Sequence, residues 1–529
     1  MNDRPSHPLS TTPLELDSDL RLHAQRLQLG RAELLTDALT LPFNDIESRL
    51  AQFALNTSTQ QAEQLRKGMK HYLGRLNSNP LIPLQFRLKV LNRFEQELDL
   101  FDADMTAAVL NSHKIAVEMV QKAARDKNSY YPILVDMLSS AMELALKLLL
   151  ISLEKYQAAS IIATRQFFEL AKLALAVSST LNNQFPEKNA RLNSVICKFE
   201  LLRLLDFYSK TGNEQKQTWK ELQHHIGSLQ AGLYRSGEAD IPLNGDRFLV
   251  TNLNRPNNSA MVLAEVPAPL QYDCIIIPID KLISRLSMAV EHIRSILGNP
   301  EHQKELYTEE AMTTTLIGGK AILAALAGQK RSGKRSDMPD TQALIEWDCS
   351  KALSSFASGI DHSQPGSMLN HSSPSQWLVI NHNAQGACLE RLSYKAMTGY
   401  VGSLIGFHCL TDDEKPRLGF VRWAKEIKTG EQRLGIAFLQ GRMQLLQGMI
   451  SGGSEDMDLK RSWPVLITAV NENKLTGLFP DNRIYRNMTF ALIKDNKRFH
   501  YRINRIIEKG PNYSRCECVR AKVKGKSET

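Results

Sequence analysis

The chain has no apolar run long enough to cross a bilayer. Its most hydrophobic segment, Ala141–Ser152, is interrupted by Glu143 and Lys147 and is shorter than the roughly 20 apolar residues that a membrane span requires. The first residues, Met1–Leu20, are polar and acidic, whereas an export signal would need a continuous apolar stretch there. We therefore expect a soluble protein that stays in the cytoplasm and has no transmembrane segment.

Cysteine is sparse, and no group of residues has the spacing of a catalytic or metal site. The seven cysteines are scattered singly except for Cys516 and Cys518, which excludes the dense pairing of a disulfide-stabilised secreted domain. His224 and His225 have no further metal ligand at a workable spacing. No general acid/base pair is recognisable, so we expect no catalytic residue, no metal, no cofactor and no enzymatic activity.

Acidic residues are scarce near the C-terminus. The formal net charge is +9, and the segment Lys494–Lys526 accounts for +8 of it, with eleven basic residues against three acidic ones. This basic segment also contains aromatic residues between its arginines; the residues concerned are Arg498, Arg502, Arg505, Phe499, Tyr501 and Tyr513. Because arginine contacts phosphates and aromatic rings stack on bases, the segment makes nucleic acid one partner open to the chain. An acidic protein or an anionic membrane surface would suit the same charge.

The length of 529 residues is typical of about three domains. Apolar spacing typical of helices runs through the first half, and short β-like runs follow. The fold class we predict is α+β multidomain: an all-helical N-terminal domain, then a β-barrel, then a second small β-barrel. The predicted boundaries are 1–46 for a polar N-terminal segment, 47–240 for the helical domain, 241–328 for a mixed linker module with helices, 329–450 for the first barrel and 459–529 for the basic second barrel.

Within the helical domain, one apolar stripe follows steps of three and four residues, through Leu138, Met142, Leu146, Leu149 and Leu153. Helix breaks are predicted where prolines occur, at Asn79-Pro80, Tyr131-Pro132 and Phe185-Pro186. In the linker module, the β-like runs are 248–251, 260–266 and 274–278, with helical spacing resuming at Asp280.

The first barrel carries the most informative pattern of the chain. A strand beginning at Trp377 ends in Asn381-His382-Asn383-Ala384-Gln385-Gly386, and strands at 418–424 and 433–439 follow it. Upstream, Arg331-Ser332-Gly333-Lys334-Arg335 forms an R-x-x-x-R loop. A predicted strand at 342–349 and a serine-rich stretch, 354–375, which we interpret as a flexible insertion, lie between the two motifs.

In this order, the motifs resemble those of the PilZ domain, a bacterial receptor for the second messenger cyclic di-GMP. The family pattern on the early strand is D/N-x-S-x-x-G, and Asn381, Asn383 and Gly386 occupy its three positions. Asn383 replaces the family's serine, and 46 positions separate Arg335 from Asn381, which is a wide spacing. The long helical region ahead of the barrel is similar to larger effector proteins of the FimW type. The resemblance covers roughly residues 325–445.

The resemblance implies a ligand site made of Arg331, Arg335, Asn381, Asn383 and Gly386. Arginine can bind a phosphate or the guanine O6/N7 edge in a bidentate way, and the Asn381 amide can pair with a guanine edge. We expect Gly386 to adopt a backbone conformation closed to other residues. The implied function is that of a non-enzymatic effector that changes its domain arrangement on binding and signals to a protein partner. Motility, attachment and biofilm control all fit the family.

Two alternatives stay open on sequence grounds. One is a nucleic-acid-binding protein that uses the basic second barrel, whose affinity should fall steeply with salt. The other is a ligand-independent scaffold whose PilZ domain has lost its site.

Overall fold

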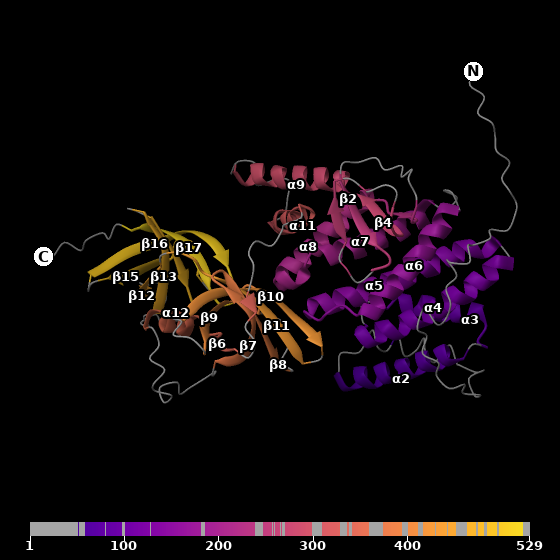
Figure 1. The fold of residues 1–529 in the computed structure, drawn as a ribbon, viewed down its shortest axis with the longest axis horizontal. Coiled ribbons are helices and arrows are strands. Elements are labelled where there is room, and N and C mark those ends of the chain that lie inside the picture. The colour runs from indigo at the N-terminus through magenta and orange to yellow at the C-terminus, as the bar shows by residue number, and fades with distance from the viewer. Residues whose placement is uncertain are drawn as a thin grey trace, which may run out of the picture. The chain divides into compact units, whose positions relative to one another are not determined.

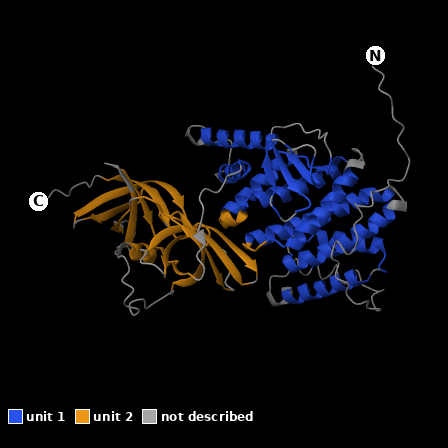
Figure 2. Cartoon of the chain, in the orientation of Figure 1, with its two compact units in different colours: residues 1–154, 159–206, 214–329 blue, residues 155–158, 207–213, 330–529 orange. Residues whose placement is uncertain are grey.

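The computed structural model describes the chain from residue 51 to residue 521, with gaps. The described residues are 51, 59–79, 81–97, 101–126, 128–180, 186–237, 247–255, 258, 260–264, 266, 270–298, 309–327, 336–337, 341–358, 374–393, 400–410, 416–428, 430–441, 443–450, 463–471, 474–480, 484–494 and 497–521. They divide into two compact units (Figure 2). The helical unit comprises 1–154, 159–206 and 214–329, and the barrel unit comprises 155–158, 207–213 and 330–529. The predicted N-terminal segment 1–46 lies outside the described residues.

The fold class is confirmed: a helical region is followed by two six-stranded antiparallel barrels. The first helices are α2 (Thr59–Ser78), α3 (Leu84–Glu95), α4 (Ala103–Asp126), α5 (Tyr131–Glu154), α6 (Ile161–Thr180), α7 (Pro186–Leu204) and α8 (Gly212–His225) (Figure 1). Their ends agree with the proline breaks, because α2 stops before Pro80 and α7 begins at Pro186, where a missing N–H is harmless. All five residues of the predicted stripe on α5 are buried. No helix among these described elements has the length and apolarity to span a membrane.

A four-stranded antiparallel sheet completes the helical unit. Its strands are β1 (Gly232–Tyr234), β2 (Phe248–Asn252), β3 (Met261–Leu263) and β4 (Cys274–Pro278), in the order β1-β4-β2-β3. The three strands predicted in the linker module are confirmed, and β1 was missed. The chain continues through α9 (Asp280–Gly298), α10 (Glu309–Thr314), a π-helical turn (Thr315–Gly319) and α11 (Lys320–Leu326).

The first barrel closes through six strands. The order is β7-β6-β9-β10-β11-β8, with β8 pairing back to β7, and a short β5 is added to β7. The elements are β5 (Ser336–Asp337), β6 (Gln342–Glu346), β7 (Ser375–Asn383), β8 (Gly386–Leu392), β9 (Leu404–Cys409), β10 (Arg417–Lys428) and β11 (Glu431–Phe438). The predicted strand 342–349 was too long, because Cys349 begins helix α12 (Cys349–Ser358). Ser354 therefore lies in a helix rather than in a flexible insertion.

The second barrel follows the order β12-β13-β14-β17-β16-β15 and is also closed. Its strands are β12 (Gln444–Ile450), β13 (Trp463–Asn471), β14 (Lys474–Phe479), β15 (Thr489–Lys494), β16 (Lys497–Lys509) and β17 (Ser514–Arg520). The sequence placed residues 444–450 at the end of the first barrel, whereas β12 pairs with β13 and β15. The other domain boundaries stay predictions.

A shared core joins the two barrels within the barrel unit. Leu353 of α12 and Leu418 of β10 belong to the same buried cluster as Leu466 and Leu478 of the second barrel. The Asn512 side chain adds polar contacts: it accepts the backbone N–H of Leu404 at 2.9 Å and donates to the Leu404 oxygen at 2.8 Å. The two barrels therefore pack as one body.

Two short segments from the helical half of the sequence are built into the barrel unit. Tyr156 is 2% exposed and belongs to the core of the first barrel, and its hydroxyl donates to the backbone oxygen of Lys210 at 2.7 Å. Glu426 of β10 forms backbone hydrogen bonds with the same segment, donating to the Tyr156 oxygen at 2.7 Å and accepting from Ala158 at 2.8 Å. The core of this barrel is therefore completed by a residue that precedes the barrel sequence.

Candidate functional site

The predicted N-x-N-x-x-G motif forms the β7–β8 hairpin. Asn383 and Gly386 face each other as the last pair of the ladder. The Asn383 side-chain oxygen accepts the backbone N–H groups of Gln385 at 2.9 Å and Gly386 at 3.0 Å. This is an Asx-type turn, in which the side chain takes over hydrogen bonds that the short loop cannot make with its own backbone. Asn383 therefore has a structural role, which the sequence did not assign to it.

A bulge in β7 decides which way the motif side chains point. The register shifts between Val379 and Asn381, so two residues on β7 oppose one on β8 and the alternation changes phase. As a result the His382 ring faces the barrel interior, 6.3 Å from the ring of Phe407 and 5.9 Å from that of Phe438. Since side chains alternate along a strand, Asn381 and Asn383 lie together on the outer face.

Gly386 is required by packing rather than by an unusual backbone conformation. Among the described glycines, positive φ occurs at Gly237, Gly402, Gly430 and Gly441, so the backbone conformation we expected for Gly386 was wrong. A Cβ at Gly386 would lie 2.1 Å from the backbone oxygen of Ile436 on β11. The absence of a side chain lets β8 and β11 approach closely at the end of their ladder.

Arg331 and Arg335 lie outside the described residues, but the chain immediately after them is described. β5 begins at Ser336, one position after Arg335, and pairs with β7 through Ser336↔His382 and Asp337↔Asn381. The described chain directly after Arg335 is thus held beside Asn381 by strand pairing.

The outer face carries a row of residues across four strands. Asn381 on β7 pairs with Cys388 on β8, Cys388 with Gly435 on β11, and Gly435 with Trp423 on β10. Adjacent strands lie about 4.8 Å apart, so the row spans about 14 Å. The indole of Trp423 lies over Gly435, because a Cβ at Gly435 would be 1.9 Å from its Nε1.

A second row runs parallel to the first, through Asn383, Gly386, Ala437 and Phe420. In both rows an asparagine stands at one end, an aromatic residue at the other, and two small residues between them. We call the four small residues the small-residue strip; they are Cys388, Gly435, Gly386 and Ala437. The sequence analysis missed Trp423 as a site residue, because its position opposite Gly435 follows from the pairing of β10 with β11.

Charged side chains border the strip. On β11, Arg433 is paired with Glu390 of β8 at 2.5 Å, and that hydrogen bond, followed by the Coulombic attraction, raises the pKa of Arg433. Arg422 is exposed at the bulge of β10, with its guanidinium 5.8 Å from the ring centre of Phe420. The face is thus polar at one end and aromatic and basic at the other.

The basic second barrel differs from its predicted form. Arg498, Arg502 and Arg505 are exposed, as the nucleic-acid alternative needs. Its aromatic residues are less accessible than predicted, however: Tyr513 is buried, and Phe499 and Tyr501 are half-buried. Tyr513 is 1% exposed and donates to Glu508 at 2.6 Å, Tyr501 packs against the barrel core, and Phe499 pairs with the core residue Leu492. The alternative therefore rests mainly on its exposed arginines.

Comparisons with known proteins give little further information. No protein-family model matches the chain, and no curated protein matches it. Among solved structures, the chain is similar to MrkH, titled "A novel c-di-GMP dependence transcription regulatory factor", with 8% sequence identity over 35% of this chain and 78% of that one. The TM-score is 0.13, which does not establish a common fold.

Proposed function

We propose that the first barrel binds cyclic di-GMP on the outer face of β7, β8, β11 and β10, and that the chain is a non-enzymatic effector of this second messenger. The observation that carries the proposal is the row Asn381–Cys388–Gly435–Trp423 with β5 anchored beside it. The described chain directly after Arg335 thus lies beside the second motif, although 46 positions separate Arg335 from Asn381.

Each part of this face suits one part of the ligand. The Asn381 amide has both a donor and an acceptor for a guanine edge. The small-residue strip keeps bulky side chains off this part of the face, and Trp423, whose indole lies over Gly435, offers an aromatic ring of the kind on which bases stack. The two phosphates need cations with planar donors, a role for which Arg331 and Arg335 are the candidates.

Binding would then act on the rest of the chain through the R-x-x-x-R segment. Neutralising its arginines favours an ordered segment over a solvated one, and order–disorder changes of this kind are a common signalling device. The altered surface would be recognised by a protein partner in motility, attachment or biofilm control.

The test is isothermal titration of the full chain with cyclic di-GMP, with GTP and linear pGpG as specificity controls. Loss of a charge-assisted hydrogen bond is worth about 1.5–3 kcal/mol, so Arg331→Ala and Arg335→Ala should each weaken binding about 10- to 100-fold. Asn381→Ala should weaken it with no change in folding. Arg498→Ala, an exposed arginine of the second barrel, is the matched control and should bind normally.

Normal affinity in the Arg331→Ala/Arg335→Ala double variant would contradict the site assignment. A folded protein that gives no saturable heat with cyclic di-GMP would contradict the function. The basic second barrel would then be the next candidate.

A further inference from the structure

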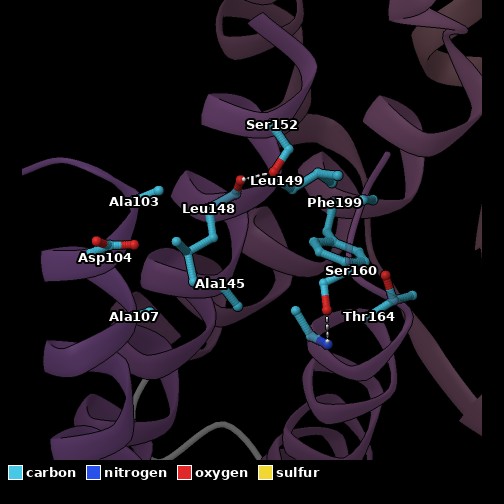
Figure 3. A pocket seen from close by; sticks show the side chains of 12 residues that line it. Ala103, Asp104, Ala107, Ala145, Leu148, Leu149, Ser152, Ser160, Thr164 and Phe199 are labelled. Atoms are coloured by element: carbon cyan, nitrogen blue, oxygen red, sulfur yellow. Dashed lines mark hydrogen bonds between the residues drawn. The ribbon is translucent and has the colours of Figure 1, made fainter. Parts of the chain in front are cut away.

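A cavity of about 300 Å³ lies in the helical unit. It is formed where the first turns of α4, the last turns of α5 and the first turns of α6 meet, with Phe199 of α7 as a further wall (Figure 3). The lining residues are Ala103, Asp104, Ala107, Ala145, Leu148, Leu149, Ser152, Ala159, Ser160, Ala163, Thr164 and Phe199.

The cavity exists because alanines occupy positions where larger side chains would fill the space between the helices. Five of the twelve lining residues are alanines. Protein interiors are otherwise close-packed, and voids much larger than a water molecule are few. Phe199 is a fixed wall rather than a mobile plug, because its ring is stacked on Phe167 with the centroids 3.6 Å apart. Most of its lining is apolar, so it can accept an apolar ligand.

The polar groups around the cavity indicate what kind of molecule it would accept. Ser152 donates to the backbone oxygen of Leu148 at 3.0 Å, and Ser160 accepts the N–H of Ala163 at 3.2 Å. Both serine hydroxyls are therefore already hydrogen-bonded to the backbone of their own helices. Thr164 is 7% exposed, and among the described residues its hydroxyl has no hydrogen-bond partner. This hydroxyl lines the cavity and can form a hydrogen bond with a ligand oxygen.

One charged group faces the same space from the opposite side. Figure 3 shows Asp104 on the α4 side of the cavity, across from Ser160 and Thr164. Its carboxylate is 80% exposed and is bound by Lys70 at 2.8 Å, so its negative charge is largely compensated outside the cavity. A ligand carboxylate entering here would lose its own hydration without gaining a cation. The site therefore favours an uncharged ligand.

We propose that this cavity binds an uncharged aliphatic molecule of medium chain length that carries one neutral oxygen group, hydrogen-bonded to Thr164. The size follows from volume: a cavity of about 150 Å³ accommodates benzene, with six heavy atoms, so twice that volume suits about twelve. Decan-1-ol, with eleven heavy atoms, is the probe of that size. Ile161 and Ile162, next to the lining residue Ser160, are 61% and 53% exposed and provide an apolar approach.

The test is titration calorimetry of the full chain with hexan-1-ol, octan-1-ol, decan-1-ol and dodecan-1-ol, each below its solubility limit. Each buried methylene is worth about fourfold in affinity, so binding should tighten at that rate from six to ten carbons. It should gain little from ten to twelve carbons, because the volume is filled. Decanoate, which matches decanol in chain length, should bind at least tenfold more weakly.

Two kinds of variant make the assignment specific. Ala145→Phe and, separately, Ala107→Leu fill the cavity from different helices and should abolish decanol binding; two variants are used so that misfolding of one does not decide the result. Thr164→Val keeps the shape and removes the hydroxyl, and should weaken decanol about fivefold, the worth of one hydrogen bond. Arg165→Ala, at an exposed position of the same helix, is the control and should bind decanol normally.

Unchanged decanol binding in a folded cavity-filling variant would overturn the proposal, as would the absence of decanol binding to the unmodified chain. Decanoate binding as tightly as decanol would overturn the assignment of an uncharged ligand. None of these results depends on cyclic di-GMP, so this proposal and the proposed function succeed or fail separately.

Discussion

The substitution Gly386→Ala separates a packing role of this glycine from a ligand-binding role. The new Cβ would lie 2.1 Å from the backbone oxygen of Ile436, whereas ordinary contacts begin near 3.4 Å. The atom that it meets belongs to the backbone of β11, so no side chain can rotate away. Strands β8 and β11, which pair over seven residues, would have to part by more than an ångström at this end.

Overpacking of this kind lowers the free energy of unfolding by about 1–3 kcal/mol. The matched control is Gly74→Ala in α2, where a Cβ has no neighbour within 4 Å. There, replacing glycine by alanine in an exposed helix should raise stability by about 0.5–1 kcal/mol. The same chemical change is thus expected to have opposite signs at the two positions.

Urea unfolding followed by tryptophan fluorescence measures the effect on the barrels, because four of the five tryptophans lie in the barrel unit: Trp347, Trp377, Trp423 and Trp463. The Gly386→Ala midpoint should move to lower urea, and affinity for cyclic di-GMP should fall because the hairpin is displaced. An unchanged midpoint with lost affinity would refute the steric argument and assign Gly386 to ligand contact. Circular dichroism at 222 nm reports the Gly74→Ala control.

Two further predictions concern other parts of the molecule. Burial lowers the pKa of Lys114 from 10.5 to about 8, so between those pH values the unfolded chain binds more protons than the folded one. The free energy of unfolding should therefore rise by about 3 kcal/mol across this window, relative to Lys114→Met. Urea unfolding of both proteins across this pH range tests it, and parallel pH curves would contradict it. The nucleic-acid alternative predicts that the three exposed arginines of the second barrel, Arg498, Arg502 and Arg505, give duplex DNA binding whose log–log salt slope is about −3. The slope should fall in magnitude by about 1 in Arg502→Ala. Fluorescence anisotropy between 50 and 200 mM NaCl tests this, and salt-independent binding would exclude it.

Sequence pattern located the strands whose residues alternate or are β-branched, and it failed where small residues interrupt them. β10 and β11 were predicted within a few residues, but β12 and β14 were not, because Gly448 and Gly477 weaken their strand patterns. Both glycines lie close to Val465, so they are needed for close strand packing. The second half of helix α12, from Ser354, was taken for a flexible insertion, because its serines conceal the apolar face that the helix forms through Leu353 and its neighbours.

The sequence predicted which residues of the hairpin belong to the candidate site, but not how their side chains are oriented. Asn381, Asn383 and Gly386 do form one hairpin, but the bulge that turns His382 inward is set by the register of β8, which no local pattern encodes. The pairing of β5 with β7 joins residues about 45 positions apart in sequence. The position of Trp423 over Gly435 joins residues 12 positions apart. Contacts of this range are decided by the whole barrel.

The insertion of Tyr156 into the first barrel bears on the order in which the chain can fold during synthesis. Its segment pairs with Glu426, and 269 positions separate Gln157 from that residue. At about 5–20 residues per second, the ribosome needs roughly 13 to 54 s to produce this distance. During that interval the helices can fold, but the barrel strands that Tyr156 packs against have not all been synthesised. The core of the first barrel can therefore be completed only after β10 has been made. Residues 330–529 produced alone would lack Tyr156, which is part of that core.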